Sequence, residues 1–422
     1  MPEHRVMLPF KANWAQPVEM TLTHKTDIFV ADAGYETRRS LRSKPRITLS
    51  FSALSVGSQI IALSRVLATS QNMLCICANP TRFVHLTADA QVGDDSLSLS
   101  ASPHWLDGTT ELVAMDSNGE VFELVELTSL NGTAAGCEDL LNPWPEGTRL
   151  CQALTGRLET QISSNVVTDA VVTTEVVFNV LPEFDYKYIP LNLEQFDGRH
   201  VIAARPNWGS AYTLENSWPV EQVDFGHGRV ETYSPIDFPA PTYAFDAQCF
   251  TFDETERDLA LFQELRGRRK YFYIPTEISD FGPDVQLGNQ NFILPTREVY
   301  DSYREHPVYR NVEVTSMVGE VIRRNITSIE LISGDRTQVN VHAAWGGTLQ
   351  TVGLKRMSWL LKARLFSDIM AIQWKTDSVS SHKFSYTALP GIGFNDYLAL
   401  RSTPEDLDRE TPAGADRAVI YL

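Results

Sequence analysis

The feature that most constrains the fold of this chain is an internal repeat. Asn13-Trp14 recurs as Asn207-Trp208, at an offset of 194 residues, and further matches follow in the same order with offsets that rise only to 208. These matches are Gly34 with Gly228, Pro45 with Pro239, Phe51 with Phe245, Ala53 with Ala247, Gly119 with Gly319, Arg157 with Arg364 and Thr168-Asp169 with Thr376-Asp377. An ordered series of this kind predicts a tandem duplication, in which both halves fold in the same way.

Each copy begins with short strands and one helix. Apolar and polar residues alternate over 46–51 and 243–247, as in half-buried strands. A helix is predicted after them in each copy, and in the second Asp253 is the expected N-cap with Glu256 three residues later. The expected buried faces are Ile60, Ile61, Leu63, Val66 and Leu67 in the first helix, and Leu259, Leu261, Phe262 and Leu265 in the second. Apolar strands follow, MLCICANP and YFYIP, each expected to stop at its proline.

The rest of each copy predicts more strands. Turn signals such as Asp116-Ser117-Asn118-Gly119 and Ser333-Gly334-Asp335 separate short alternating runs, which favours a small barrel or sandwich. A hairpin around Thr168-Asp169, and again around Thr376-Asp377, then returns to complete the first sheet. We therefore expect a mainly β fold, a tandem duplication of a β-sandwich module with one helix and an inserted small β-barrel.

The expected domains follow from this division. They are 1–85 with 156–183 as the first sandwich module, 86–155 as its inserted barrel, 184–195 as a linker, 196–277 with 357–390 as the second module, 278–356 as the second barrel and 391–422 as an extended arm.

Charge and composition exclude several classes of protein. The net charge of −17 opposes sequence-independent binding to nucleic acid or anionic lipid. No apolar stretch has the length of a membrane span, and the N-terminal residues lack the pattern of a signal peptide, which predicts folding in a cytoplasm. The odd number of cysteines predicts buried thiols rather than a disulfide framework.

The motifs of common catalytic sites are missing from the sequence. It has no phosphate-binding loop, no dinucleotide fingerprint and no nucleophile elbow. The nine histidines are scattered singly, so we expect no metal, no cofactor and no catalytic residue. Acidic pairs such as Asp94-Asp95 and Glu138-Asp139 leave glycoside hydrolysis open. The tryptophans that would accompany such a site repeat between the copies, Trp144 with Trp345 and Trp14 with Trp208, which points to packing instead.

One local cluster stands out against the acidic background. Residues 34–46 carry Arg38, Arg39, Arg42 and Arg46 together with a lysine. The segment reads either as a solvated hairpin arm or as a docking surface for an acidic neighbour, because arginine forks suit carboxylates. We take these four arginines as candidate interface residues.

The same segment resembles a known family. The series Asn13-Trp14, Pro17, Thr26-Asp27-Ile28, Gly34-x-Glu36-x-Arg38-Arg39-x-Leu41-Arg42-x-x-Pro45-Arg46 and Phe51 is similar to the N-terminal pattern of tail proteins of long-tailed, non-contractile bacteriophages. Arg205-Pro206-Asn207-Trp208, Gly228 and Ile372-x-Trp374-x-Thr376-Asp377 resemble the second module of that family. The resemblance covers about residues 8–390, although the second copy has Tyr233-Ser234-Pro235-Ile236 where the arginines would stand.

This resemblance implies a structural virion protein of the distal-tail or tail-hub type. Such a protein forms a trimeric or hexameric ring of itself at the tail tip, joins the tail tube, surrounds the tape-measure protein, and supports other hub or baseplate proteins and fibres. Its location would be the virion tail, after synthesis in the host cytoplasm, and no catalysis is implied. Two alternatives stay open: a receptor- or glycan-binding tail component, and a tail-associated cell-wall or polysaccharide hydrolase.

Overall fold

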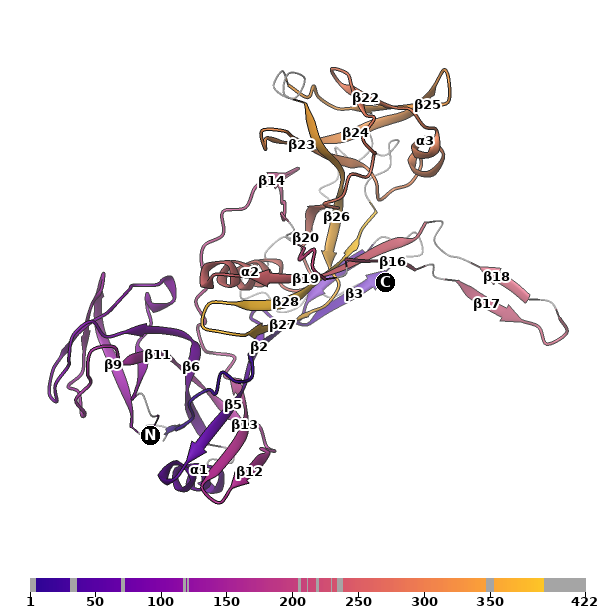
Figure 1. Ribbon diagram of the computed structural model, residues 1–422. Coiled ribbons are helices and arrows are strands. Elements are labelled where there is room, and N and C mark those ends of the chain that lie inside the picture. The colour runs from indigo at the N-terminus through magenta and orange to yellow at the C-terminus, as the bar shows by residue number, and fades with distance from the viewer. Residues whose placement is uncertain are drawn as a thin grey trace, which may run out of the picture. The chain divides into compact units, whose positions relative to one another are not determined.

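The computed structural model describes residues 5–30, 36–69, 73–116, 119, 121–203, 206–210, 212–217, 220–228, 230–233, 238–346 and 353–390. Strands make up 52% of the chain and helices 9%, with large antiparallel sheets, so the expected mainly β class is confirmed (Figure 1). The expected arm at 391–422 lies outside the described residues, as do Gly34, Arg205 and Ser234–Ile236 of the resemblance. The sandwich form of the modules remains a prediction.

The chain forms two compact units. The first lies within Met1–Phe272 and Ala363–Ala388, and the second lies mainly within Tyr273–Lys362. Both copies of the first sheet therefore belong to one unit, whereas the insertion of the second copy forms a unit of its own.

The first copy begins with a sheet and a helix. Its elements are β1 Arg5–Met7, β2 Val18–Thr23, β3 Thr26–Val30, β4 Glu36–Ser40, β5 Arg46–Val56, α1 Ser58–Thr69, β6 Leu74–His85, β12 Ser164–Thr168 and β13 Val171–Val180. Strand β5 pairs antiparallel with β2 on one side and with β13 on the other, and β13 forms a hairpin with β12. The returning hairpin thus completes the sheet begun by the N-terminal residues.

A second group of strands is inserted between β6 and the returning hairpin. It consists of β7 Ser96–Ser98, the 3-10 turn η1 His104–Leu106, β8 Glu111–Met115, β9 Phe122–Asn131, β10 Ala134–Cys137 and β11 Arg149–Leu158. Antiparallel pairings run from β6 through β11, β8, β9 and β10 to β7, and the bridge between Leu86 and Leu99 joins β7 back to the end of β6. The buried residues Trp105, Leu112 and Trp144 fill the centre of this closed ring of strands.

The second copy repeats the first sheet. Its elements in the first unit are β14 Gln195–Phe196, β15 Arg199–His200, β16 Thr213–Ser217, β17 Glu221–Asp224, β18 Val230–Tyr233, β19 Ala240–Cys249, α2 Phe252–Leu265, β27 Ile369–Trp374 and β28 Ser380–Ala388. In the second copy, the strand order is β16, β19, β28, β27. The corresponding order in the first copy is β2, β5, β13, β12.

The second insertion repeats the pairing order of the first. Its elements are β20 Tyr271–Pro275, β21 Gln286–Leu287, β22 Asn291–Leu294, α3 Glu298–Tyr303, β23 Asn311–Ser316, β24 Val321–Ile332, β25 Arg336–Val341 and β26 Leu354–Leu365. The boundary between the two units falls within β20 and within β26. Pairings run from β26 through β23, β24 and β25 to β22. Trp345, the counterpart of Trp144, is likewise almost fully buried, as expected from its repetition.

The repeat extends to single backbone hydrogen bonds. Ala12 bridges Ala53 in the first copy, and Pro206 bridges Ala247 in the second, both at an offset of 194. In the same way, the Asn13 N–H donates to the Ser52 carbonyl and the Asn207 N–H donates to the Asp246 carbonyl. Each asparagine side chain also accepts from the N–H two residues later. The duplicated Asn-Trp signal is thus a duplicated turn.

Some expectations about single residues were wrong. The N-cap of α2 is Thr251, whose hydroxyl accepts from the Glu254 N–H, so the helix begins before the expected Asp253. Ile61 of α1 is 74% exposed, because the apolar residues of that helix exceed the width of its packed face. Trp208 is 64% exposed and therefore is not a packing residue like Trp144. The third helix, α3, was not expected from the pattern.

Pro80 does not end its strand. Strand β6 runs through it to His85, and its pairing with β11 shifts register between Cys151 and Ala153, opposite the proline. A proline is tolerated at a bulge because the ladder lacks a hydrogen bond there. The second apolar strand, β20, does end at Pro275 as expected.

A buried ion pair links the two copies inside the first unit. The Arg82 guanidinium on β6 donates to Glu256 on α2 through Nε at 3.0 Å and Nη2 at 2.5 Å, and neither side chain is exposed. Arg82 also stacks 3.7 Å from the Tyr186 ring centroid and donates to the Lys187 carbonyl, and His104 lies 3.1 Å from Glu256. Burial alone would raise the pKa of Glu256, but Arg82 and His104 hold it below its usual value.

We expect Glu256→Gln to lower the free energy of unfolding by about 3–5 kcal/mol, because it leaves the Arg82 charge buried without its counter-ion. Replacing both residues, as Arg82→Met with Glu256→Leu, should cost less than Glu256→Gln alone. Urea denaturation measures both. The matched control is Asp185→Asn, which breaks the exposed ion pairs of Asp185 with Lys44 and Lys187; it should cost less than about 1 kcal/mol. Equal losses for the two single variants would contradict the role assigned to the buried pair.

In the second unit, burial raises the pKa of Asp280 from 3.8 to about 6. Its carboxylate accepts from the Thr276 hydroxyl and, at 2.8 Å, from the Trp359 N–H. A carboxyl group whose pKa is raised on folding stabilises the fold most below its unfolded pKa, and this stabilisation is lost as the pH rises towards 6.

We therefore expect the free energy of unfolding of the wild type, relative to Asp280→Asn, to fall by at most about 3 kcal/mol between pH 4 and pH 7. Urea denaturation at several pH values measures the difference. A difference that stays constant with pH would contradict the raised pKa.

Candidate assembly interfaces

Strand β2 of the first copy joins the sheet of the second copy. Its other edge pairs antiparallel with β27, with Val18 opposite Trp374 and Thr23 opposite Ile369. Met20 and Ile372, which face each other across this seam, are fully buried. The continuous order β13, β5, β2, β27, β28, β19, β16 therefore makes one sheet from two copies.

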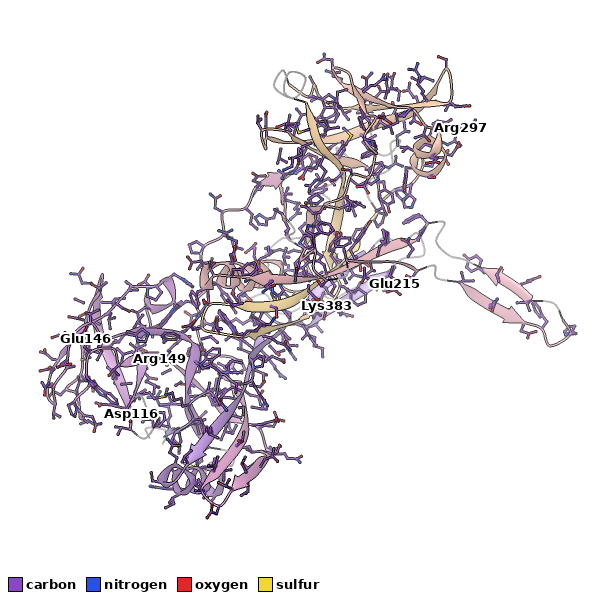
Figure 2. All side chains as sticks on the ribbon, viewed as in Figure 1. Asp116, Glu146, Arg149, Glu215, Arg297 and Lys383 are labelled. Atoms are coloured by element: carbon purple, nitrogen blue, oxygen red, sulfur yellow. The ribbon has the colours of Figure 1, made fainter. Side chains whose placement is uncertain are left out.

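The counterparts of the two seam strands are sheet edges. Strand β16 corresponds to β2, and its only pairing among the described residues is with β19. Strand β12 corresponds to β27, and its described pairing is with β13. Both strands are exposed along their whole length, including Glu215 of β16, which is labelled in Figure 2. An unpaired edge presents backbone N–H and C=O groups to which another strand can add.

The hairpin of β3 and β4 is anchored by the second copy. The Asp368 carboxylate accepts from the Thr26 N–H at 2.6 Å, from the Thr26 hydroxyl at 2.9 Å and from the Arg268 N–H at 2.8 Å. Burial would raise the pKa of Asp368, but these hydrogen bonds and the Arg268 charge lower it. Glu36 accepts a bidentate pair from Arg364, at 2.6 and 2.9 Å. The glutamate of the arginine-rich motif thus serves a contact within the chain.

The hairpin of β17 and β18 is exposed at every residue of it whose burial the structure describes. Figure 1 draws it as a thin two-stranded ribbon. Its apolar side chains Val223, Val230 and Tyr233 are all more than half exposed, and Gly226 and Gly228 at its turn have positive φ angles. A two-stranded ribbon of this kind is marginally stable alone, so it is a second candidate contact element.

The structure separates the four candidate arginines into two pairs. Arg38 is half-buried, 5.9 Å from the Tyr271 ring centroid, and Arg42 is half-buried and donates to the Thr23 carbonyl. Arg39 and Arg46 are exposed. Arg39 lies opposite Asp27 on the hairpin, and Arg46 lies opposite Thr23 at the start of β5. Only the exposed pair is placed to meet another molecule.

The structure also brings together a cysteine, an aspartate and a histidine. Cys249 lies at the end of β19, Asp258 on α2 and His382 on β28. The Cys249 thiol donates to Asp258 at 3.3 Å, and His382 Nε2 lies 3.6 Å from the same carboxylate oxygen. Burial and the Asp258 charge raise the pKa of Cys249 to about 12, and burial lowers the pKa of His382. A thiol whose pKa is raised is not an activated nucleophile, so this group does not have the chemistry of a cysteine hydrolase.

Sequence reasoning missed this group of three. Asp258 lies 9 residues after Cys249, and His382 lies 124 residues after Asp258, so the three do not form a motif of recognisable spacing. Strand pairing supplies the proximity: Ala247 lies opposite His382 and Cys249 opposite Ser380. It is the group of possible metal ligands found among the residues that the structure describes.

Comparisons with known proteins do not add a family. The chain matches no protein-family model and no curated protein. Among the described residues, no helix is long and apolar enough to span a membrane.

Proposed function

We propose that the protein is a structural component of the tail tip or baseplate of a long-tailed, non-contractile phage. In this proposal, several identical chains join head to tail as a ring. The observation that carries this proposal is the β2–β27 seam together with the counterpart strands β16 and β12, each of which has one pairing among the described residues. The arginine-rich motif and its resemblance to tail proteins support the assignment to a phage tail.

The duplication supplies the geometry of assembly. Strand β2 pairs with β27 within the chain, so β16 of one chain would pair with β12 of the next chain in the same antiparallel way. The two edges differ, and contacts between different surfaces form a closed ring when the rotation between neighbours divides a full turn. A trimer would present six quasi-equivalent modules and match a sixfold tube, and a hexamer would present twelve.

The repeated register predicts which residues meet. The pairing of β2 with β5 reappears in β16 with β19 at an offset of 194, and that of β27 with β28 reappears in β12 with β13 at an offset of 208. In the seam within the chain, Met20 lies opposite Ile372. With these two offsets, Leu214 of one chain would lie opposite Ser164 of the next chain. Leu214 is 51% exposed in the single chain and would be covered in the ring.

The charged clamp of the inner seam is not repeated. By the same offsets, Asp368 corresponds to Thr160 and Glu36 to Val230. The proposed seam between neighbouring chains would therefore depend on backbone hydrogen bonds and apolar side chains. It would lack the carboxylates that anchor β3 and β4 in the seam within the chain. For this reason we expect the ring to form at high protein concentration and to dissociate on dilution.

The other proposed partners are the tail tube protein, the tape-measure protein, and other hub or fibre proteins. The net charge of −17 suits a lumen through which DNA passes without binding. The exposed arginines Arg39 and Arg46 would meet an acidic neighbour.

A disulfide across the proposed seam tests the ring directly. The variant Leu214→Cys with Ser164→Cys should form covalent multimers on mild oxidation at high protein concentration, up to a closed trimer or hexamer on a denaturing gel. The native cysteines do not interfere, because Cys75, Cys77, Cys137, Cys151 and Cys249 are all buried.

The matched control shifts the register by one residue. Leu214→Cys with Asn165→Cys places the two thiols on opposite faces of the sheet and should not link. Native mass and electron microscopy of the unmodified protein would show rings of three or six chains. A strict monomer at every concentration, or equal linking of both cysteine pairs, would exclude the β16–β12 seam.

The exposed arginines allow a second test. Arg39→Glu with Arg46→Glu should leave the monomer folded and weaken assembly with an acidic partner, most strongly at low salt. The control Lys355→Glu with Lys375→Glu changes the net charge equally at other exposed positions. Circular dichroism checks folding, and assembly is followed by native mass with and without the tail tube protein. If both double variants lose assembly equally, the loss is due to net charge alone, and Arg39 and Arg46 have no specific docking role.

A further inference from the structure

We propose that Cys249, Asp258 and His382 form a binding site for a zinc-type divalent cation that ties α2 to the β19–β28 sheet. This site is independent of the proposed ring, because its three ligands belong to one chain and none of them is on β16 or β12. It would staple the second copy of the sheet to its own helix.

The geometry of the three side chains carries the inference. The Cys249 sulfur, an Asp258 carboxylate oxygen and a His382 ring nitrogen all lie within 4.8 Å of one another. The contacts through Asp258 are shorter, 3.3 Å to Cys249 Sγ and 3.6 Å to His382 Nε2. Ligands bound to one zinc ion at about 2.0–2.3 Å in a tetrahedron lie roughly 3.3–3.8 Å apart, so small side-chain movements suffice.

The donor set selects the metal class. A thiolate, an imidazole and a carboxylate are the three ligand types that zinc uses, whereas calcium and magnesium require oxygen ligands throughout. Three protein ligands leave the fourth tetrahedral position for water or for another group. Cys249 and His382 are buried, while the Asp258 side chain is 30% exposed, so a cation can enter beside Asp258.

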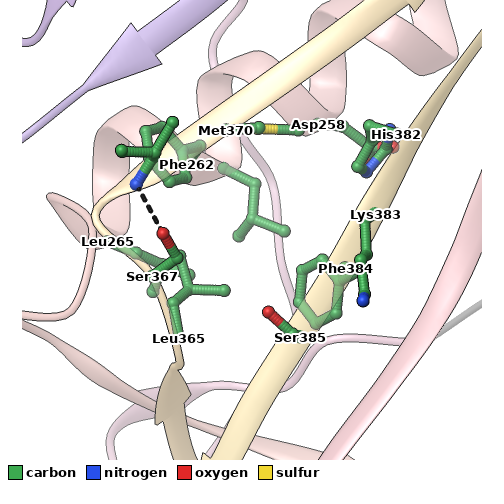
Figure 3. A pocket seen from close by; sticks show the side chains of 12 residues that line it. Asp258, Phe262, Leu265, Leu365, Ser367, Met370, His382, Lys383, Phe384 and Ser385 are labelled. Atoms are coloured by element: carbon green, nitrogen blue, oxygen red, sulfur yellow. Dashed lines mark hydrogen bonds and ion pairs between the residues drawn. The ribbon is translucent and has the colours of Figure 1, made fainter. Parts of the chain in front are cut away.

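A cavity of about 30 Å³ adjoins the site. Figure 3 shows Asp258 and His382 side by side at one end of it, with the apolar side chains of Phe262, Leu265 and Met370 along the rest. This volume is large enough to hold a water molecule, which can occupy the fourth position of the metal.

The surroundings of His382 are a second, independent observation. Its side chain is 1% exposed, and its Nδ1 atom is buried without a hydrogen-bond partner. A buried polar atom without a partner destabilises a fold. Because Nδ1 makes no hydrogen bond, the imidazole ring can turn about its χ2 angle to present a nitrogen to a cation without breaking a hydrogen bond at Nδ1.

The sheet fixes two of the three ligands before any metal binds. Cys249 and His382 lie on the paired strands β19 and β28, where Cys249 is opposite Ser380, two residues before His382. Asp258 is held on α2, whose Thr255 hydroxyl lies 2.7 Å from the Ser380 hydroxyl on β28. Binding thus requires little ordering of the chain, although the Cys249 thiol must release its proton.

The test is a titration of the purified full-length chain, after treatment with a chelator, with zinc chloride in competition with a chromogenic chelator. We expect one zinc ion per chain and a higher midpoint of thermal unfolding when zinc is present. Cobalt in place of zinc should give the absorption of a thiolate-to-metal charge transfer, which reports directly on Cys249.

Three variants give the proposal its controls. Cys249→Ser should abolish the charge-transfer band, and Asp258→Asn should weaken zinc binding at least about 100-fold. Cys137→Ser, which changes a buried cysteine in the first insertion, should leave both unchanged. Thermal unfolding in chelator shows whether each variant is folded, and Asp258 is exposed enough to tolerate its substitution. Absence of zinc binding by the wild type, or binding that survives both Cys249→Ser and Asp258→Asn, would overturn the site.

Discussion

The pairing of β2 with β27 is the constraint on which the first unit depends. A buried strand edge must have its N–H and C=O groups paired, and β2 reaches this state only because the second copy supplies β27. The side chains at this seam, among them Met20, Ile372 and Trp374, are fully buried, so the two copies share one core. Asp368 and the Glu36–Arg364 pair close the same seam with charged groups.

The same rule explains why the chain leaves two edges open. Each module has two different sheet edges. When two modules join, the first uses one kind of edge and the second uses the other kind, so one edge of each kind is left unused at the ends of the pair. Among the residues that the structure describes, these are β16 and β12, which are exposed along their lengths. The ring proposed above would pair these two edges between neighbouring chains.

Polar groups inside the first unit have a different role, because they decide how its elements are oriented. Arg82 and Glu256 lie 174 residues apart and are both fully buried, so each requires the other. Together with Tyr186 and His104, they fix α2 against β6 and the first insertion. Asp258, also on α2, contacts Cys249 of β19 and His382 of β28. One helix therefore takes part in two separate polar clusters.

The sequence by itself determined the mainly β class, the order of the repeated elements and the burial of Trp144 and Trp345, because strand alternation and repeated spacings are local properties of the chain. It also located the arginine-rich segment, but it did not distinguish the half-buried Arg38 and Arg42 from the exposed Arg39 and Arg46. Only the tertiary structure decided that Glu256 pairs with Arg82 rather than capping its helix, that Trp208 is exposed, and that Cys249 meets His382. These are contacts between residues far apart in the chain, which strand pairing creates and no local pattern records.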